Sequence, residues 1–171
     1  MPDAPFKLSE PVTRTVPAFT ALTAAGRLTI PGIPVFAERA TTDLMRLADA
    51  HRLPIIAPPV FIYANADDGN ASTFVMQIAM PVAEGTTLAG PGADERFAVK
   101  RFEAFDCLPG DYRGPMTHIG DAYPLVVDAI GPTGRTAAEQ SREVYKHWVG
   151  YDEPDNVIEI QIGLLSFPGE P

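Results

Sequence analysis

A glutamate and a tyrosine share one face of a predicted strand near the end of the chain, and this pair is the strongest candidate for chemistry. Side chains alternate between the two faces of a β-strand, so in REVYKHW Glu143 and Tyr145 point one way and Trp148 points the other. A carboxylate beside a phenol on an otherwise apolar face could hold an organic cation or polarise a bound substrate. The alternative is that this face is turned to water.

Motifs for metal, nucleotide and serine chemistry are absent from the sequence. It contains no CxxC pair, HExxH, GxSxG, P-loop or GxGxxG. The three histidines, His51, His118 and His147, fall on different predicted elements. The single cysteine, Cys107, is expected to be a small core residue. We therefore predict no metal site and no cofactor.

The charge of the chain disfavours several classes of partner. Its 171 residues carry a formal net charge of −9, which opposes attraction to nucleic-acid phosphates and anionic membranes. No apolar run approaches the roughly 20 residues that cross a bilayer, and the first residues do not resemble a signal peptide. We expect a cytoplasmic protein without direct nucleic-acid or membrane partners. A protein partner and the oligomeric state stay open.

Hydrophobic patterns divide the first half into a strand, a helix and two strands. Residues 11–22 favour β-structure, although Pro17 makes this an edge or bulged strand. Apolar residues at helical spacing begin at Pro34, and the helix ends at Leu53. Two strands, joined by a turn-rich loop, are expected at 55–64 and 73–81.

The second half repeats this order. A strand is expected from 97 to 108, with a turn at Pro109-Gly110. A helix should run from about 115 to 130, and Pro124 should kink or break it. The last two strands, joined by a turn at 153–156, are expected at 141–149 and 156–165.

The repeated order predicts an α+β fold made of duplicated β-α-β-β units. VMQI in the first half corresponds to EIQI in the second, on equivalent strands. We expect residues 1–171 to form a single domain, with one repeat over about 11–81 and the other over about 97–165. A pseudo-twofold axis should relate the repeats, and helices should cover one face of a mainly antiparallel sheet.

Two aromatic residues of the first half occupy the strand equivalent to that of Glu143 and Tyr145. These are Phe61 and Tyr63, and the symmetry would let all four side chains converge on a cleft between the repeats, the usual form of a small-molecule site. The alternative is that Phe61 and Tyr63 pack beneath a helix. We expect Glu143 to be largely buried in this cleft, where desolvation would raise its pKa.

The element order, with REVYKHW, a short Pro/Asn turn and VIEIQIGLL, resembles the GyrI-like small-molecule-binding family, also met as the effector-binding domain of multidrug-responsive transcription regulators. The resemblance spans about 11–165. It implies a pocket between the repeats for amphipathic or cationic organic molecules, with Glu143, Tyr145, Trp148 and Tyr112 among its residues. Before the second helix this chain has YRGPM, where members have a His-x-Gly-Pro-Tyr-like turn. Regulators add a helix-turn-helix domain for which the chain has no room, so it resembles the stand-alone type.

Three functions stay open. The favoured one is binding of a lipophilic or cationic small molecule, with Glu143 as the countercharge and aromatic faces supplying cation–π attraction. The second, implied by the resemblance, is hydrolysis of strained cyclopropane-bearing toxins. Glu143 would then orient or deprotonate water, and Tyr145 would donate a hydrogen bond to the developing oxyanion. The third is inhibition of a protein target through the acidic surface.

Overall fold

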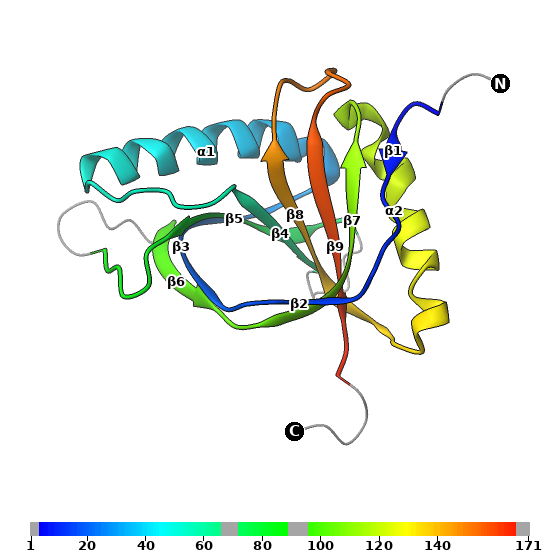
Figure 1. The fold of residues 1–171 in the computed structure, drawn as a ribbon. Coiled ribbons are helices and arrows are strands. Elements are labelled where there is room, and N and C mark those ends of the chain that lie inside the picture. Colours follow the sequence, from blue (N-terminus) through cyan, green and yellow to red (C-terminus); the bar gives the residue numbers. More distant parts are fainter. Residues whose placement is uncertain (1–3, 66–71, 89–95, 167–171) are drawn as a thin grey trace. The chain divides into compact units, whose positions relative to one another are not determined.

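The computed structural model describes residues 4–65, 72–88 and 96–166, which divide into two compact units (Figure 1). Residues 17–104 form one unit, called here the central unit. The other consists of residues 1–16 and 105–171 and is called the terminal unit, because both chain ends belong to it. No helix in the described part of the chain has both the length and the apolar character needed to span a membrane.

The central unit is an antiparallel four-stranded sheet with one helix packed on it. The strands lie in the order β4-β5-β3-β6, and α1 contacts β3 and β5. The elements are β3 (Phe19–Leu28), a 3₁₀ turn (Ile30–Gly32), α1 (Ile33–Ala50), β4 (Val60–Asn65), β5 (Phe74–Val82) and β6 (Phe97–Phe102).

The core of the central unit lies between α1 and the sheet. Every fourth residue of α1, namely Ala40, Leu44 and Ala48, is buried, which is the stripe that a helix presents to a core. On β5 the alternate residues Met76, Ile78 and Met80 are buried. They pair with Gly26, Ala24 and Leu22 of β3, and the ring of Phe36 from α1 lies directly over Gly26.

The terminal unit is also an antiparallel sheet with one helix. β9 lies between β7 and β8, and the two short strands β1 and β2 pair with the other edge of β7. The elements are β1 (Lys7–Leu8), β2 (Arg14–Val16), β7 (Phe105–Arg113), a 3₁₀ turn (Met116–His118), α2 (Ile119–Asp128), a second 3₁₀ turn (Gly131–Thr133), β8 (Ala137–His147) and β9 (Val157–Leu164).

The core of the terminal unit lies between α2 and the sheet. Ala122 and Val126 of α2 are fully buried against it. Four alternate apolar residues of β9 are buried in the same cluster. These residues are Ile158, Ile160, Ile162 and Leu164.

Both units repeat one topology, which confirms the predicted α+β fold of duplicated strand-helix-strand-strand units. In each, the last strand lies between the other two. The register repeats as well, since equivalent side chains of β4 and β8 pair with core residues of the last strand. The pairs are Phe61 with Ile78, Tyr63 with Met76, Glu143 with Ile160, and Tyr145 with Ile158. The pseudo-twofold axis and the single domain stay predictions.

The expected single strand over 97–108 is wrong. The chain breaks at Glu103-Ala104 into β6, which pairs with β3 in the central unit, and β7, which pairs with β9 in the terminal unit. Residues 97–102 therefore pack with the first half of the chain, and not with the second as expected. The apolar pattern misled because it continues through the break between two strands of different units.

The expected turn at Pro109-Gly110 is also wrong, because both residues lie inside β7. The Asp111 N–H donates to Ser9 Oγ, 2.8 Å away, on the edge of β7 that faces β1 and β2. Successive N–H groups of a strand point to opposite edges, so the Pro109 nitrogen is directed to this same edge. It falls in the gap between β1 and β2, where its missing N–H costs no ladder hydrogen bond.

Two other prolines differ in their effect on secondary structure, since one interrupts a strand and the other is accommodated within a helix. Pro17 interrupts the strand expected at 11–22, which divides into β2 and the longer β3. Pro124 lies inside α2 without breaking it, so the expected break is not found. Burial of Ala122 and Val126 on either side of Pro124 holds this helix to the sheet, since packing of an apolar face supplies most helical stability in proteins.

We predict that Gly163→Ala destabilises the terminal unit. A Cβ at this position of β9 would lie 2.6 Å from the backbone oxygen of Gln140 and 3.0 Å from the ring of Phe105. Overpacking of this kind typically costs about 1–3 kcal/mol. Urea unfolding should show that loss, whereas the control Gly131→Ala, which meets no atom within 4 Å, should change the free energy of unfolding by less than about 0.5 kcal/mol. Equal stabilities of the two variants would contradict the close packing of Gln140 and Phe105 against Gly163.

Candidate functional site

Glu143 and Tyr145 lie on the face of β8 that belongs to the core of the terminal unit. Their partners in register, Ile160 and Ile158, are core residues that pack with α2. Glu143 is only 4% exposed, so the prediction that it is largely buried is confirmed. The alternative, in which this face is turned to water, does not hold for the carboxylate.

Two tyrosines hold the buried carboxylate, one on each oxygen. The hydroxyl of Tyr123 on α2 donates to Glu143 Oε1 at 2.6 Å, and the hydroxyl of Tyr145 donates to Oε2 at 2.9 Å. That the pKa of Glu143 is raised stays a prediction.

Trp148 extends the aromatic surface beyond Tyr145. The register of β8 and β9 shifts between Tyr145 and His147, and the indole lies 5.7 Å from the Tyr145 ring at an interplanar angle of 58°. Strict alternation, which placed these two side chains on opposite faces, is therefore wrong at the end of this strand. Trp148 is 49% exposed. Tyr123, Glu143, Tyr145 and Trp148 are called the Glu143 cluster below.

Tyr123 is the member of the cluster that sequence reasoning missed. It lies within the helix expected at about 115–130, and no binding role was assigned to it. It packs at the edge of the core of the terminal unit, and its hydroxyl also reaches Glu143. A phenol on a core-facing stripe was the available signal, because a buried tyrosine hydroxyl usually has a polar partner.

The other predicted ligand-binding residues lie in different surroundings. Tyr112 is fully buried, packs 5.3 Å from the Phe6 ring and donates to the Pro115 carbonyl at 2.5 Å, which is the environment of a packing residue. Phe61 and Tyr63 belong to the central unit, on the sheet face that carries α1. Their convergence with Glu143 in a cleft stays a prediction.

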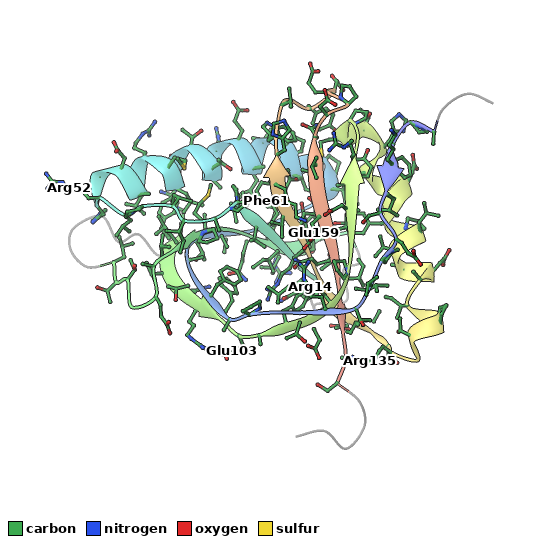
Figure 2. All side chains as sticks on the ribbon, viewed as in Figure 1. Arg14, Arg52, Phe61, Glu103, Arg135 and Glu159 are labelled. Carbon is green, nitrogen blue, oxygen red and sulfur yellow. The ribbon has the colours of Figure 1, made fainter. Side chains whose placement is uncertain are left out.

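A second buried acid, Glu159, lies on the opposite face of the same strand pair. Arg14 and Lys146 donate to it, Lys146 at 2.7 Å, and Gln161 Nε2 donates to Oε1 at 2.6 Å. Figure 2 shows Arg14 and Glu159 side by side. Burial raises the pKa of Glu159, but the hydrogen bonds from Arg14, Lys146 and Gln161 outweigh it and lower the pKa to about 2. This acid is a structural ion-pair centre.

Two further groups near this network carry perturbed pKa values. Arg142 is buried with its guanidinium 3.8 Å above the Phe105 ring, and burial lowers its pKa to about 10. Cys107 is fully buried, and burial raises the pKa of its thiol to about 11. A thiol with so high a pKa is a poor nucleophile at neutral pH. The described residues include no group of three or more His, Cys, Asp or Glu side chains placed to hold a metal ion.

No protein-family model and no curated protein matches the sequence, but solved structures match the fold. EcmrR, in a cryo-EM structure of its DNA complex, matches with a TM-score of 0.71 at 12% identity, over 94% of this chain and 57% of that chain. The chain thus spans just over half of EcmrR. The crystal structure of the EcmrR C-terminal domain gives a TM-score of 0.70 at 13% identity, over 92% of this chain and 98% of that one. The shared part of EcmrR is its C-terminal domain.

Two complete chains match as well. SAV2435 bound to tetraphenylphosphonium has a TM-score of 0.64 at 13% identity, over 92% of this chain and 94% of that one. The chain has the GyrI-like fold. A hydrolase from Listeria innocua shares the GyrI-like fold with a TM-score of 0.63 at 12% identity, over 91% of this chain and 92% of that one.

We predict that Glu159 makes stability depend on acid pH. Its pKa falls from an ordinary 4.5 to about 2 in the folded state, so its contribution is complete above about pH 5 and is lost as the pH falls toward 2. A shift of this size corresponds to about 3 kcal/mol. Urea unfolding of the wild type and Glu159→Gln should show a difference in stability that is largest at pH 5–7 and shrinks by about that amount at pH 2. A difference independent of pH would contradict the assignment.

Proposed function

We propose that this protein binds a lipophilic organic cation at the Glu143 cluster. One observation carries the proposal: a carboxylate that is 4% exposed is held by two phenol hydroxyls, with a half-exposed indole beside one of the phenols. Taking a carboxylate out of water is costly. A site that bears this cost and surrounds the acid with aromatic rings suits a ligand that is both positively charged and apolar.

The two tyrosines fit this role because a phenol donates a hydrogen bond to the carboxylate and carries no positive charge of its own. Glu159 is held differently, since it receives the cationic side chains of Arg14 and Lys146. Tyr145 and Trp148 add ring faces to which a cation is attracted by about 0.5–2 kcal/mol each. The fold shared with SAV2435, whose structure is bound to tetraphenylphosphonium, supports the same class of ligand.

We predict that Glu143→Gln weakens binding of tetraphenylphosphonium by about tenfold or more, a loss of about 1.4 kcal/mol. Trp148 is the only tryptophan of the chain, so its fluorescence reports directly on the cluster. Titration of the wild type with tetraphenylphosphonium should change this fluorescence with saturation. Tetraphenylborate, an anion of the same shape, should bind far more weakly, because the buried carboxylate repels it.

Glu139→Gln is the matched control, because it removes the same charge from an exposed position of β8. It should leave the affinity for tetraphenylphosphonium unchanged within about twofold, whereas long-range charge effects alone would lower it in both variants. If Glu143→Gln and Glu139→Gln bind the cation as the wild type does, the Glu143 cluster is not the binding site.

Hydrolysis of a strained electrophile is the second candidate function, and the two phenols on the Glu143 carboxylate favour it. Glu143 would take a proton from water while the water oxygen bonds to a cyclopropane carbon. The ring C–C bond would break, and its electron pair would move to a conjugated carbonyl oxygen. A tyrosine hydroxyl would protonate that oxygen and recover its proton from Glu143, so that water is added overall.

Mass spectrometry distinguishes the two functions. Incubation with a cyclopropane-bearing alkylating compound should yield the product of water addition only if the protein is a hydrolase. Glu143→Gln should then abolish turnover while a neutral ligand of similar shape still binds. Saturable binding of tetraphenylphosphonium without any water-addition product would support the binding function and count against hydrolysis.

A further inference from the structure

The loop between β8 and β9 is built around the side chain of Asn156. This side chain is fully buried and makes four hydrogen bonds within the loop. Its Oδ1 accepts from the N–H groups of Val149 and Gly150, at 2.8 and 3.3 Å. Its Nδ2 donates to the carbonyls of Gly150 and Glu153, at 2.6 and 3.0 Å. Both ends of the amide are thus fully used, and they fix the path of the backbone on both sides of the turn.

The same loop is tied to the segment that leads into α2. The Gly114 N–H donates to the Asn156 carbonyl at 3.2 Å, and the Met116 N–H donates to the Tyr151 carbonyl at 2.8 Å. The turn is also tight, since a Cβ at Gly150 would lie 3.1 Å from Glu153 Cγ. The loop therefore has little freedom to move, although most of its side chains are exposed.

Trp148 lies between two fixed points. On one side, Tyr145 belongs to β8 and its ring contacts the indole. On the other side, the next residue, Val149, is bound through its N–H by Asn156. A half-exposed tryptophan would ordinarily sample several rotamers, but here its backbone is anchored at both ends. The anchored backbone limits the positions that the indole can reach, and in the ligand-free structure the indole lies against the Tyr145 ring.

We propose that Asn156 is a positioning residue that holds Trp148 as an aromatic wall of the Glu143 cluster, and that this wall makes the site prefer aryl cations to alkyl cations of equal charge. The inference rests on the proposed function. Glu143 and the ring face of Trp148 attract any cation, whereas stacking against a fixed indole adds affinity only for a ligand that has flat rings. Pre-ordering a side chain also removes the entropic cost of ordering it on binding.

The test compares tetraphenylphosphonium with tetrabutylphosphonium by isothermal titration calorimetry, which needs no tryptophan signal. Asn156→Asp keeps the acceptor but loses both donors, and Trp148→Leu removes the wall. Each should lower the affinity for the aryl cation by roughly three- to tenfold, the size expected for losing one ordered ring contact. Each should lower the affinity for the alkyl cation by a smaller factor, so that the ratio of aryl to alkyl affinity falls. Glu153→Gln, an exposed change in the same loop, should change neither.

A loss of stability alone would weaken both ligands together, so the ratio of the two affinities is the decisive readout. If Glu143→Gln weakens both cations while Asn156→Asp and Trp148→Leu leave their ratio unchanged, the wall is refuted and the proposed function stands. If Glu143→Gln weakens neither, the proposed function fails, and the inference about cation choice fails with it.

Time-resolved fluorescence anisotropy of Trp148 tests the positioning step, and on the wild type it does not depend on whether a variant folds. The indole should rotate with the whole protein in the wild type and gain fast internal motion in Asn156→Asp. Fast wide-angle motion of Trp148 in the ligand-free wild type would overturn the proposal. Equal anisotropy decays in a folded Asn156→Asp variant would overturn it as well.

Discussion

A carboxylate that leaves water must receive hydrogen-bond donors, and the terminal unit meets this demand twice across one pair of strands. Glu143 on β8 and Glu159 on β9 are both buried, and they lie on opposite faces because Glu143 pairs with Ile160 and Val144 pairs with Glu159. One acid receives phenols and the other receives cations. Phenols satisfy the oxygens of Glu143 by neutral hydrogen bonds, whereas the charge of Glu159 is used in ion pairs that join β2, β8 and β9.

The fold was predictable because its strongest signals are local. Alternation of apolar residues along β5 and β9, and the four-residue spacing on α1, follow from side-chain geometry within single elements. The burial of Glu143 did not follow from its strand pattern alone, which also allowed a face turned to water, and its predicted place in a pocket came from the resemblance to the GyrI-like family. The correspondence of Glu143 with Phe61 follows from the shared pairing of β4 and β8 with the strand that ends each unit.

The features that sequence reasoning missed depend on contacts between different helices and strands, and local sequence patterns do not encode such contacts. Nothing local shows that Tyr123 reaches β8, because this depends on how α2 lies on the sheet. Trp148 escaped strict alternation because of a shift in pairing after Tyr145, and such shifts depend on both strands. Glu103-Ala104 divides one apolar run because the strands on either side pair with different partners. The role of Asn156 likewise depends on the folded turn, because its side chain binds the backbone of residues three to seven positions earlier in the chain.

The discontinuity of the terminal unit has a consequence for how the chain is made. The central unit is one uninterrupted segment, so all its strands are available once residue 104 has left the ribosome. Arg14, in contrast, emerges early but finds Glu159 only when β9 has been synthesised. Until β9 has been synthesised, Arg14 lacks its partner Glu159, whereas residues 17–104 already contain every strand of the central unit. Pairing of Arg14 with Glu159 therefore requires the synthesis of every strand of the central unit first, so the terminal unit is completed after the central unit is able to fold.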